Sequence, residues 1–228
     1  MAEQPKSEVS YGPEAFKACR MPLQPLEMPA PAEIHVWFLD LEQLAGSLRG
    51  ALGDEHHAAE PFTPGQLRFA RRFHLRLLLG AYLGMPGKSV VINRKNRGKP
   101  VLDASVHPES LHFSMAKSEG RLLIGLSTSS YLGVDLEPAG RRARNALGVA
   151  RRYFSPVESA ALEAVPPRQR DAAFLRAWAC KEAVVKASGL GIANQLCRFT
   201  VETDLERPPA VLDFDGGGPG RWSLAVLR

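Results

Sequence analysis

The sequence has few cysteines, no long apolar run and no apolar segment near its first residue. Its three cysteines, Cys19, Cys180 and Cys197, are widely spaced and odd in number, which fits neither a disulfide framework nor a metal-binding cluster. The longest apolar runs, such as 77–79, are far shorter than the roughly 20 residues of a membrane-spanning helix. The first residues are partly charged and lack the apolar core of a secretory signal. We therefore expect reduced thiols, no membrane partner and a cytoplasmic location.

The overall composition is that of an ordinary globular protein with an excess of positive charge. Hydrophobic residues make up 45% and charged residues 23% of the chain, so a packed core can form. The formal net charge is +5 and the pI is about 9.3, which favours an anionic partner. Composition leaves three partner classes open: nucleic acid, a phosphate-rich small molecule and an acidic protein.

Proline is concentrated at the start of the chain. Six of the 18 prolines fall within residues 1–32, where no helical or strand periodicity is sustained. We predict a proline-rich arm over 1–32 and a folded region that begins near Glu33.

Hydrophobic periodicity predicts a mixture of helices and strands after the arm. Thr63 and Ser155 each begin a capping box with proline at the first helical position, and they mark the starts of two helices. Gly84 and Gly189 each follow the last periodic residues of a helix and act as C-terminal caps. The predicted helices are 41–52, 64–83, a short one from 156 that stops before Pro166, and 169–187; the predicted strands are 34–39, 90–92, 111–113, 122–126 and 132–137, with a hairpin around Trp222.

Two carboxylates share one face of the predicted strand 132–137. Side chains alternate along a strand, so Asp135 and Glu137 point the same way while the intervening apolar residues face a core. Oxygen ligands of this kind suit magnesium, and Glu182 on the helix 169–187 is a candidate third ligand. Taken alone, such a pair is more often a solvated sheet face.

Glu182 and Lys186 stand four residues apart on the same predicted helix. A purely structural alternative is that the two residues form an ion pair that stabilises a surface helix by about 0.2 to 0.5 kcal/mol. That alternative explains neither the adjacent Trp178 nor the glycine-containing segment 188–191 that follows directly.

Taken together, the segments around these residues resemble the paired signature of the 4′-phosphopantetheinyl transferases. Order, spacing and residue types agree in 133–137 (GVDLE) and, about 45 residues later, in 178–189 (WACKEAVVKASG). Three further blocks extend the similarity over residues 34–191: they are 97–102 (RGKPVL), 113–118 (FSMAKS) and 153–158 (YFSPVE). Each block is a weak pattern by itself, whereas their joint occurrence in this order is highly specific.

The resemblance carries expectations about the fold. The length of 228 residues is similar to that of the longer, surfactin synthetase activator-like members of the family. Such a member has an α+β fold of two similar α/β halves with pseudo-twofold symmetry, binds coenzyme A in the cleft between them and is a monomer. The N-terminal half would span 33–130 and hold the coenzyme A phosphate contacts. The C-terminal half would span 131–228 and hold the magnesium site and the catalytic helix.

The resemblance also implies a magnesium-dependent enzyme. It would transfer the 4′-phosphopantetheine arm of coenzyme A to a serine of an apo acyl, peptidyl or aryl carrier protein and release 3′,5′-ADP. Asp135, Glu137 and Glu182 correspond to the magnesium ligands, and Asp135, Glu182 and Lys186 to the catalytic residues. Glu182 would take the serine proton, directly or through a metal-bound water, while Lys186 would stabilise the phosphate charge.

Other positions correspond to contacts with coenzyme A. The predicted contacts with the nucleotide and its phosphates are Lys99, Arg71, Arg72 and His56. The block 114–118 departs from the family pattern, because Ala116 and Lys117 stand where a serine and a histidine are usual. Lysine keeps a cation at that place over a wider pH range than histidine. We therefore expect Lys117 to maintain phosphate binding, with the hydroxyl contact at Ala116 lost.

Two alternatives to a transferase remain open at this point. The Ala116–Lys117 departure is compatible with a non-catalytic protein that binds coenzyme A or docks to carriers, although such a protein does not need Asp135, Glu182 and Lys186 together. The basic turn 94–99 is compatible with nucleic-acid binding, but no recognised motif or aromatic stacking pattern accompanies it. We therefore expect no nucleic-acid partner.

The carrier partner is expected to be acidic at its docking surface, which suits a positively charged enzyme. The basic run 141–152 is a candidate to meet it, although such runs are more often a solvated face. The sequence does not distinguish carriers of fatty-acid, polyketide or nonribosomal peptide synthesis.

Overall fold

The computed structural model describes most of the chain from residue 24 onward. The described ranges are 24–31, 33–53, 60–95, 98–107, 111–138, 141–189, 191, 196–201, 210–215 and 221–227, the last two for their backbone alone. The predicted arm 1–32 therefore lies largely outside the described residues, and so does His56.

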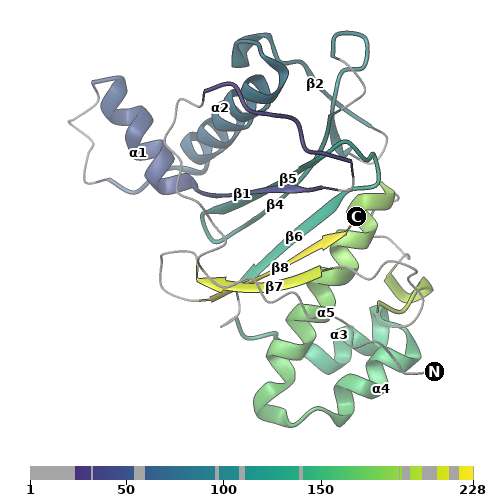
Figure 1. Ribbon diagram of the computed structural model, residues 1–228. Coiled ribbons are helices and arrows are strands. Elements are labelled where there is room, and N and C mark those ends of the chain that lie inside the picture. Colours follow the sequence, from purple (N-terminus) through teal and green to yellow (C-terminus); the bar gives the residue numbers. More distant parts are fainter. Residues whose placement is uncertain are drawn as a thin grey trace.

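The first half of the chain forms a three-stranded antiparallel sheet with one long helix packed on it (Figure 1). The sheet has the order β1-β5-β4, and a separate two-stranded ribbon, β2-β3, lies beside it. Its elements are β1 (His35–Asp40), α1 (Leu41–Ala51), α2 (Pro64–Leu83), the 3-10 turn η3 (Gly87–Ser89), β2 (Ile92–Arg94), β3 (Pro100–Leu102), β4 (His112–Ser118) and β5 (Arg121–Ser127).

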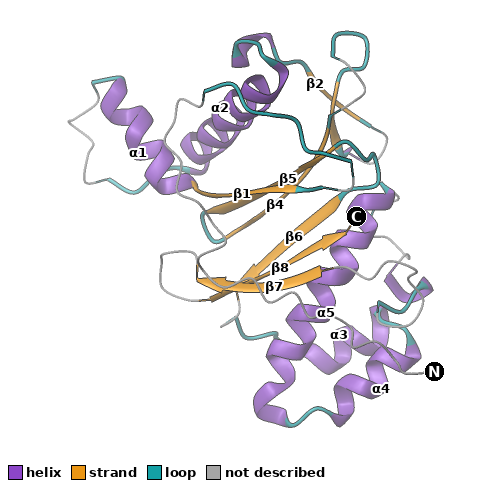
Figure 2. Ribbon diagram, viewed as in Figure 1, coloured by secondary structure: helices purple, strands orange, loops and turns teal. Residues whose placement is uncertain are grey.

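The second half forms a second antiparallel sheet covered by the longest helix, α5 (Figure 2). Its order, β6-β8-β7, repeats that of the first sheet, since in both the first strand of the half pairs with the last, which pairs with the one before it. Its elements are β6 (Gly133–Pro138), α3 (Ala146–Tyr153), α4 (Pro156–Ala164), α5 (Pro167–Ser188), the 3-10 turn η5 (Leu196–Arg198), β7 (Ala210–Asp215) and β8 (Arg221–Leu227). The structure thus confirms an α+β fold.

Local capping signals account for where the helices begin and end. Thr63 and Ser155 both form the predicted reciprocal capping boxes, with proline in the first turn of α2 and α4. Gly84 and Gly189 adopt left-handed φ angles of 64° and 70° at the ends of α2 and α5, which a residue with a Cβ adopts at a cost. These four predictions are confirmed.

Several elements differ from the prediction. Strand β3 was not predicted, and β4 continues to Ser118 where the predicted strand ended at residue 113, since its whole length pairs with β5. Strand β2 begins at Ile92 rather than residue 90, because Val90 N still donates to Gly87 O and closes the η3 turn. Helix α3 was not predicted; the side chain of Asn145 accepts a hydrogen bond from Gly148 N and caps it, so part of the basic run 141–152 is helical. The predicted hairpin around Trp222 is confirmed as the β7-β8 pair.

The two halves are joined by an apolar cluster between their sheets. Helix α2 covers one face of the first sheet, with Leu75, Leu78 and Leu79 in the core. On the other face, Ala116 of β4 and Leu123 of β5 pack with Val134 and Leu136 of β6 and with Leu132, which directly precedes it. The predicted inward face of this strand is therefore confirmed, and β6 is a shared element of both halves.

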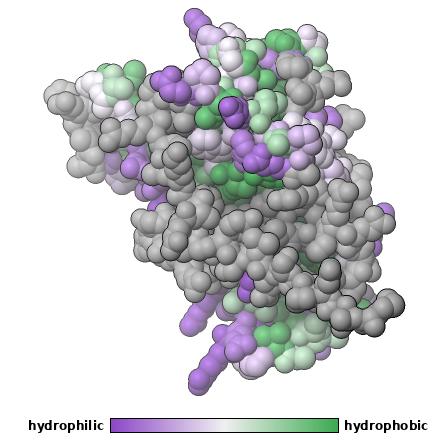
Figure 3. All heavy atoms as spheres, viewed as in Figure 1, coloured by the Kyte–Doolittle hydropathy of each residue, from purple (hydrophilic) through white to green (hydrophobic). Residues whose placement is uncertain are grey.

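The composition-level expectations concern thiols and membranes. Cys180 is buried and Cys197 exposed, and neither forms a disulfide with another described residue, whereas Cys19 lies outside the described residues. Among the described helices, none is long and apolar enough to cross a membrane. On the face shown in Figure 3, hydrophilic and hydrophobic residues are interspersed over the described surface.

Candidate active site

The carboxylate face of β6 lies against α5 and not in solvent. Asp135 and Glu137 are only 4% and 7% exposed, so the alternative of a solvated sheet face is wrong. The two elements approach closely, since a Cβ placed on Gly133 would lie 1.8 Å from Ala183 O. Glycine at this point of β6 therefore allows the helix to come close enough for its side chains to reach the carboxylates.

Three predicted catalytic side chains meet at this contact. Lys186 Nζ lies 2.5 Å from Asp135 Oδ1 and 3.7 Å from Glu182 Oε2. Glu182 and Lys186 are one helical turn apart and so share a face of α5. The structure thus brings together Asp135, Glu182 and Lys186. In the sequence, Lys186 is 51 positions from Asp135 and four from Glu182.

Burial and mutual repulsion perturb two of the acids. Burial raises the pKa of Glu182 to about 7, with a further contribution from the negative charge of Asp135, and Lys186 opposes both. Burial also raises the pKa of Glu137 to about 7, although the guanidinium of Arg141, 3.1 Å from Glu137 Oε2, counteracts it. Such crowding of buried carboxylates is typical of functional sites.

The donor atoms at this place suit a hard cation. Asp135 Oδ2 is buried without a hydrogen-bond partner, and the buried Glu137 Oε2 has only its ion-pair contact with Arg141. A cation among the carboxylates would relieve their repulsion. Within the described part of the chain, no group of three or more His, Cys, Asp or Glu is arranged as a complete metal site. Magnesium commonly takes one or two carboxylates together with waters and substrate phosphates. The neighbouring carboxylates of Asp135 and Glu182 fit that mode.

Lys99 reaches this region from the first half of the chain. Its ammonium donates to Lys186 O at 2.6 Å and to Leu132 O at 3.2 Å, and burial lowers its pKa. In the structure, Lys99 therefore donates hydrogen bonds to two backbone carbonyls of the second half. Its contact with a phosphate stays a prediction.

A strongly basic cavity lies between α2 and the β2-β3 ribbon. Its volume is about 320 Å³, and its lining residues are Arg71, Arg72, Leu75, Arg76, Ile92, Arg94, Pro100 and Met115. Burial and the nearby charges of Arg72 and Arg94 lower the pKa of Arg71. Such a concentration of guanidinium groups is suited to binding phosphate.

Two of the cavity arginines, Arg71 and Arg72, were predicted contacts of the nucleotide, and Arg76 and Arg94 were missed. The spacing of Arg72 and Arg76 on one helix face is a signal that was available in the sequence. Arg94 reaches the cavity through the fold of the ribbon, which local spacing does not indicate.

The two residues that depart from the family pattern lie on opposite faces of β4. Ala116 is buried in the apolar cluster against β6, whereas Lys117 is exposed. Ser114, on the same face as Ala116, accepts a hydrogen bond from Val134 N at 3.2 Å. The methyl group of Ala116 therefore contributes to the joint between the halves, and the free ammonium of Lys117 stays a predicted phosphate contact.

A buried lysine next to Glu182 was not predicted to have a structural role. Lys181 has no exposed surface, and its Nζ lies 2.6 Å from Leu196 O, 2.7 Å from Phe199 O and 2.7 Å from Glu158 Oε2. It thereby ties α5 to α4 and to the segment around η5. A helical wheel shows only that Lys181 and Glu182 point in different directions, so no local pattern in the sequence indicates these partners.

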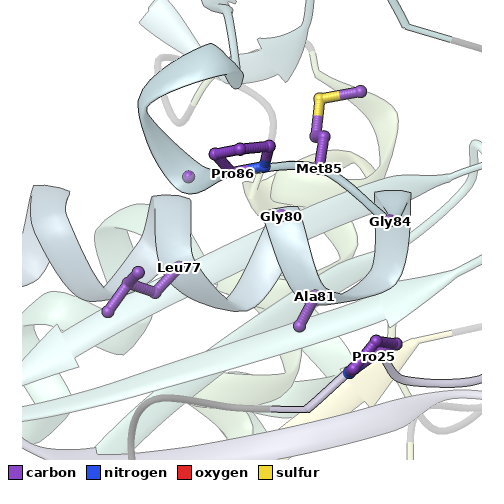
Figure 4. A pocket seen from close by; sticks show the side chains of 8 residues that line it. Pro25, Leu77, Gly80, Ala81, Gly84, Met85 and Pro86 are labelled. Atoms are coloured by element: carbon purple, nitrogen blue, oxygen red, sulfur yellow. The ribbon is translucent and has the colours of Figure 1, made fainter.

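Another cavity lies at the C-terminal end of α2, with a volume of about 360 Å³. The side chains that surround it are mostly small or apolar, as Figure 4 shows: Pro25, Leu77, Gly80, Ala81, Gly84, Met85, Pro86 and Gly87 line it. None of the predicted site residues takes part, so this cavity is separate from the carboxylates.

Comparisons with known proteins agree on one family. The family model of the 4′-phosphopantetheinyl transferase superfamily matches residues 131–228. The chain is 34% identical over 169 residues to the 4′-phosphopantetheinyl transferase HetI of Nostoc sp., a match that covers 71% of each chain. It is 37% identical over 115 residues to AcpT of Salmonella typhimurium and 29% identical over 118 residues to a 4′-phosphopantetheinyl transferase of Bacillus subtilis. These two matches span 55% and 50% of those relatives.

Proposed function

The chain belongs to the 4′-phosphopantetheinyl transferase superfamily, and on that premise we propose that it transfers the 4′-phosphopantetheine arm of coenzyme A to a serine of an apo carrier protein. The observation that carries the proposal is the contact of Lys186 with Asp135 beside Glu182. These residues lie in the two segments, 133–137 and 178–189, on which the resemblance rests.

In the reaction, the carrier serine hydroxyl attacks the phosphorus that bears the pantetheine arm. The bond from that phosphorus to the leaving 3′,5′-ADP breaks, and the serine proton must be removed. Glu182, whose side chain is more exposed than those of Asp135 and Glu137, would accept this proton. The ammonium of Lys186, held by Asp135, stabilises the negative charge that develops on the phosphate oxygens.

Magnesium would be held by Asp135 and Glu182, with Glu137 as a third ligand. When bound, the ion supplies positive charge at the pyrophosphate of coenzyme A. Support comes from the buried, unpaired Oδ2 of Asp135 and from the carboxylate-only donor set. The neighbouring Arg141, which lies 3.1 Å from Glu137 Oε2, partly neutralises this acid when no metal is present.

The nucleotide part of coenzyme A would bind the arginines of α2 and β2. Arg71 and Arg72 line a basic cavity with Arg94, and among the described residues these three form no ion pair with an acid. Guanidinium groups without carboxylate partners are available for the phosphates of the nucleotide. Lys117, exposed at the end of β4, can add a further charge.

The architecture supports two similar halves. Both sheets have the same strand order, and each carries a long helix on one face. We propose that the halves 33–130 and 131–228 are related by a pseudo-twofold axis and that coenzyme A lies in a cleft between them. On this basis the enzyme acts as a monomer in the cytoplasm.

A non-catalytic role in binding coenzyme A or docking carriers is not favoured. It was motivated by Ala116 and Lys117, yet Ala116 packs in the joint between the halves, where its methyl group has a structural reason. Burying Asp135 beside Glu182 costs stability, which a docking module has no need to bear.

The test is transfer itself. Purified protein is mixed with magnesium, coenzyme A and a panel of apo acyl and peptidyl carrier proteins, and each carrier is weighed by intact-protein mass spectrometry. We expect at least one carrier to gain the mass of one phosphopantetheine, and a chelator to abolish the gain. A folded enzyme that modifies no carrier would contradict the proposal.

Two variants assign the gain to this site. We expect Glu182→Gln and Asp135→Ala each to lower turnover by about 100-fold or more, because a proton acceptor or an electrostatic anchor typically contributes factors of this size. Glu163→Gln, which removes an exposed acid from α4, is the matched control and keeps wild-type turnover. Circular dichroism verifies that all three variants are folded, and wild-type rates in either site variant would exclude the assignment.

A further inference from the structure

Lys99 connects the two halves of the molecule at the point where the catalytic elements meet. It lies just before β3 in the first half, and its ammonium donates to Lys186 O of α5 and to Leu132 O, directly before β6. The residues joined are 87 and 33 positions apart in sequence. One side chain thus holds both elements that carry the candidate catalytic residues.

The first of these contacts caps the end of α5. The last carbonyls of a helix lack intrahelical partners. Val185 O accepts hydrogen bonds from Gly189 N and Ser188 Oγ, while Lys186 O receives the ammonium of Lys99 at 2.6 Å. A cation is favourable there because the C-terminal end of a helix carries partial negative charge. Lys99 therefore supplies a C-terminal cap to α5 from the other half of the chain.

The second contact fixes the start of β6. Leu132 O accepts from Lys99, and the next residue, Gly133, lies so close to α5 that an added Cβ would be 1.8 Å from Ala183 O. Two residues later comes Asp135, which contacts the side chain of Lys186. The hydrogen bonds of Lys99 and the Lys186–Asp135 ion pair therefore lie within a few residues of each other on β6 and α5.

We infer that Lys99 is a positioning residue: it sets α5 against β6 from the opposite half, so that the Lys186 ammonium stays at Asp135. The catalytic consequence rests on the proposed transfer reaction. Two of the three N–H donors of Lys99 are taken by backbone carbonyls. Turning the ammonium toward a phosphate would leave two partly buried carbonyls without partners, which is unfavourable.

The kinetic test compares Lys99→Met with Lys95→Met. Lys95 lies exposed in the same turn, so its variant removes the same charge without touching α5. We expect Lys99→Met to lower kcat on a carrier protein by about 10- to 100-fold, the effect of losing charge-assisted hydrogen bonds. Its Kd for coenzyme A, from calorimetry without carrier, should change by less than about threefold. Lys95→Met should retain wild-type kcat, and Lys99→Arg, which keeps the cation, should recover part of it.

A phosphate contact predicts the opposite split. If Lys99→Met weakens coenzyme A binding by more than about tenfold and leaves kcat at saturating coenzyme A unchanged, the positioning role is wrong.

Hydrogen exchange tests the same inference without any turnover. We expect backbone amides in the last turn of α5 and the first residues of β6 to exchange faster in Lys99→Met than in Lys95→Met. Unchanged exchange there would contradict the inference even if the enzyme is active. A wild type that modifies no carrier would instead contradict the proposed function, and the exchange result would still decide the role of Lys99.

Discussion

Charged and titratable side chains occupy buried positions in this protein, and the partners of each explain its burial. Lys181 is paired with Glu158 and two carbonyls, and Lys99 is half-buried on two carbonyls. Asp135 is different, because one of its oxygens is buried without a partner. A buried polar atom without a partner costs stability, so this unpaired oxygen, on a side chain that also contacts Lys186, supports placing the chemistry at Asp135.

His74 provides a residue-scale prediction for pH. It is buried in α2, its Nδ1 lies 2.8 Å from Ala70 O, and burial lowers its pKa below the ordinary value of 6.5. A histidine with a lowered pKa binds fewer protons folded than unfolded, so its contribution to stability is present above pH 6.5 and is lost as the pH falls below that value. We expect the free energy of unfolding of the wild type to fall more steeply from pH 7 to pH 5 than that of His74→Leu.

Urea denaturation at intervals of half a pH unit measures this difference. The other titrating groups are the same in both proteins and cancel in the comparison. Parallel curves for the two proteins over this range would show that His74 is not held neutral.

Helix α5 makes three sets of contacts, on two of its faces and at its C-terminal end. One face, with Glu182 and Lys186, meets β6. Another buries Lys181 against α4 and the η5 segment, and the C-terminal end receives Lys99 from the other half. The orientation of Glu182 therefore depends on contacts made by its neighbours along the same helix, because a rotation of α5 would break all of them together.

The Lys181 contacts provide the element-scale prediction. Removing one member of a buried ion pair leaves the other charge uncompensated, which typically costs about 3 to 5 kcal/mol. We expect Lys181→Met to lower the free energy of unfolding by about this amount. The double variant with Glu158→Gln should recover part of the loss, because no buried charge is then left unpaired. Urea denaturation of the three proteins measures both effects.

A loss below about 1 kcal/mol in Lys181→Met would mean that the pair contributes no more than an exposed one. If the double variant is less stable than the single one, the hydrogen bonds that Glu158 accepts from Ser155 N and Val201 N outweigh the cost of its unpaired charge.

At the scale of the whole molecule, two sheets of equal strand order share β6 as their joint. The apolar side of β6 seals the first sheet, and its carboxylate side faces α5. The net charge of +5 is carried partly by exposed arginines after β6, among them Arg142 and Arg144. A positively charged surface close to the proposed site is suited to an acidic carrier.

Salt dependence is the prediction at this scale, and it rests on the proposed transfer. Raising ionic strength from about 0.1 M to about 1 M shortens the Debye length from about 10 Å to about 3 Å. We expect the KM for an acidic carrier to rise over this range. The double variant Arg142→Glu with Arg144→Glu should raise the KM at low salt and flatten its salt dependence. Transfer rates at several carrier concentrations provide the KM values.

The control variant changes charge by the same amount elsewhere. Lys88→Glu with Arg168→Glu alters two exposed positions outside the run after β6. Equal effects of the two double variants would mean that only the net charge matters and that Arg142 and Arg144 form no docking surface.

The sequence by itself determined the features that depend on neighbours along the chain. Capping boxes at Thr63 and Ser155 and left-handed glycines at Gly84 and Gly189 fix helix ends through bonds between residues at most a few positions apart. The alternation of β6 gave its two faces in the same way. The family was also recognisable from the sequence, because each signature segment, 133–137 and 178–189, is contiguous and the two lie about 45 residues apart along the chain.

Only the tertiary structure decided which side chains meet. The carbonyl partners of Lys99, the burial of Lys181 and the place of Arg94 beside α2 all involve residues that are distant in sequence. Local periodicity reports which way a side chain points from its own element, but it does not report which element lies opposite. For that reason the sequence indicated Lys99 only as a phosphate contact, which stays a prediction, and its hydrogen bonds to Lys186 O and Leu132 O became apparent only from the packing of α5 on β6.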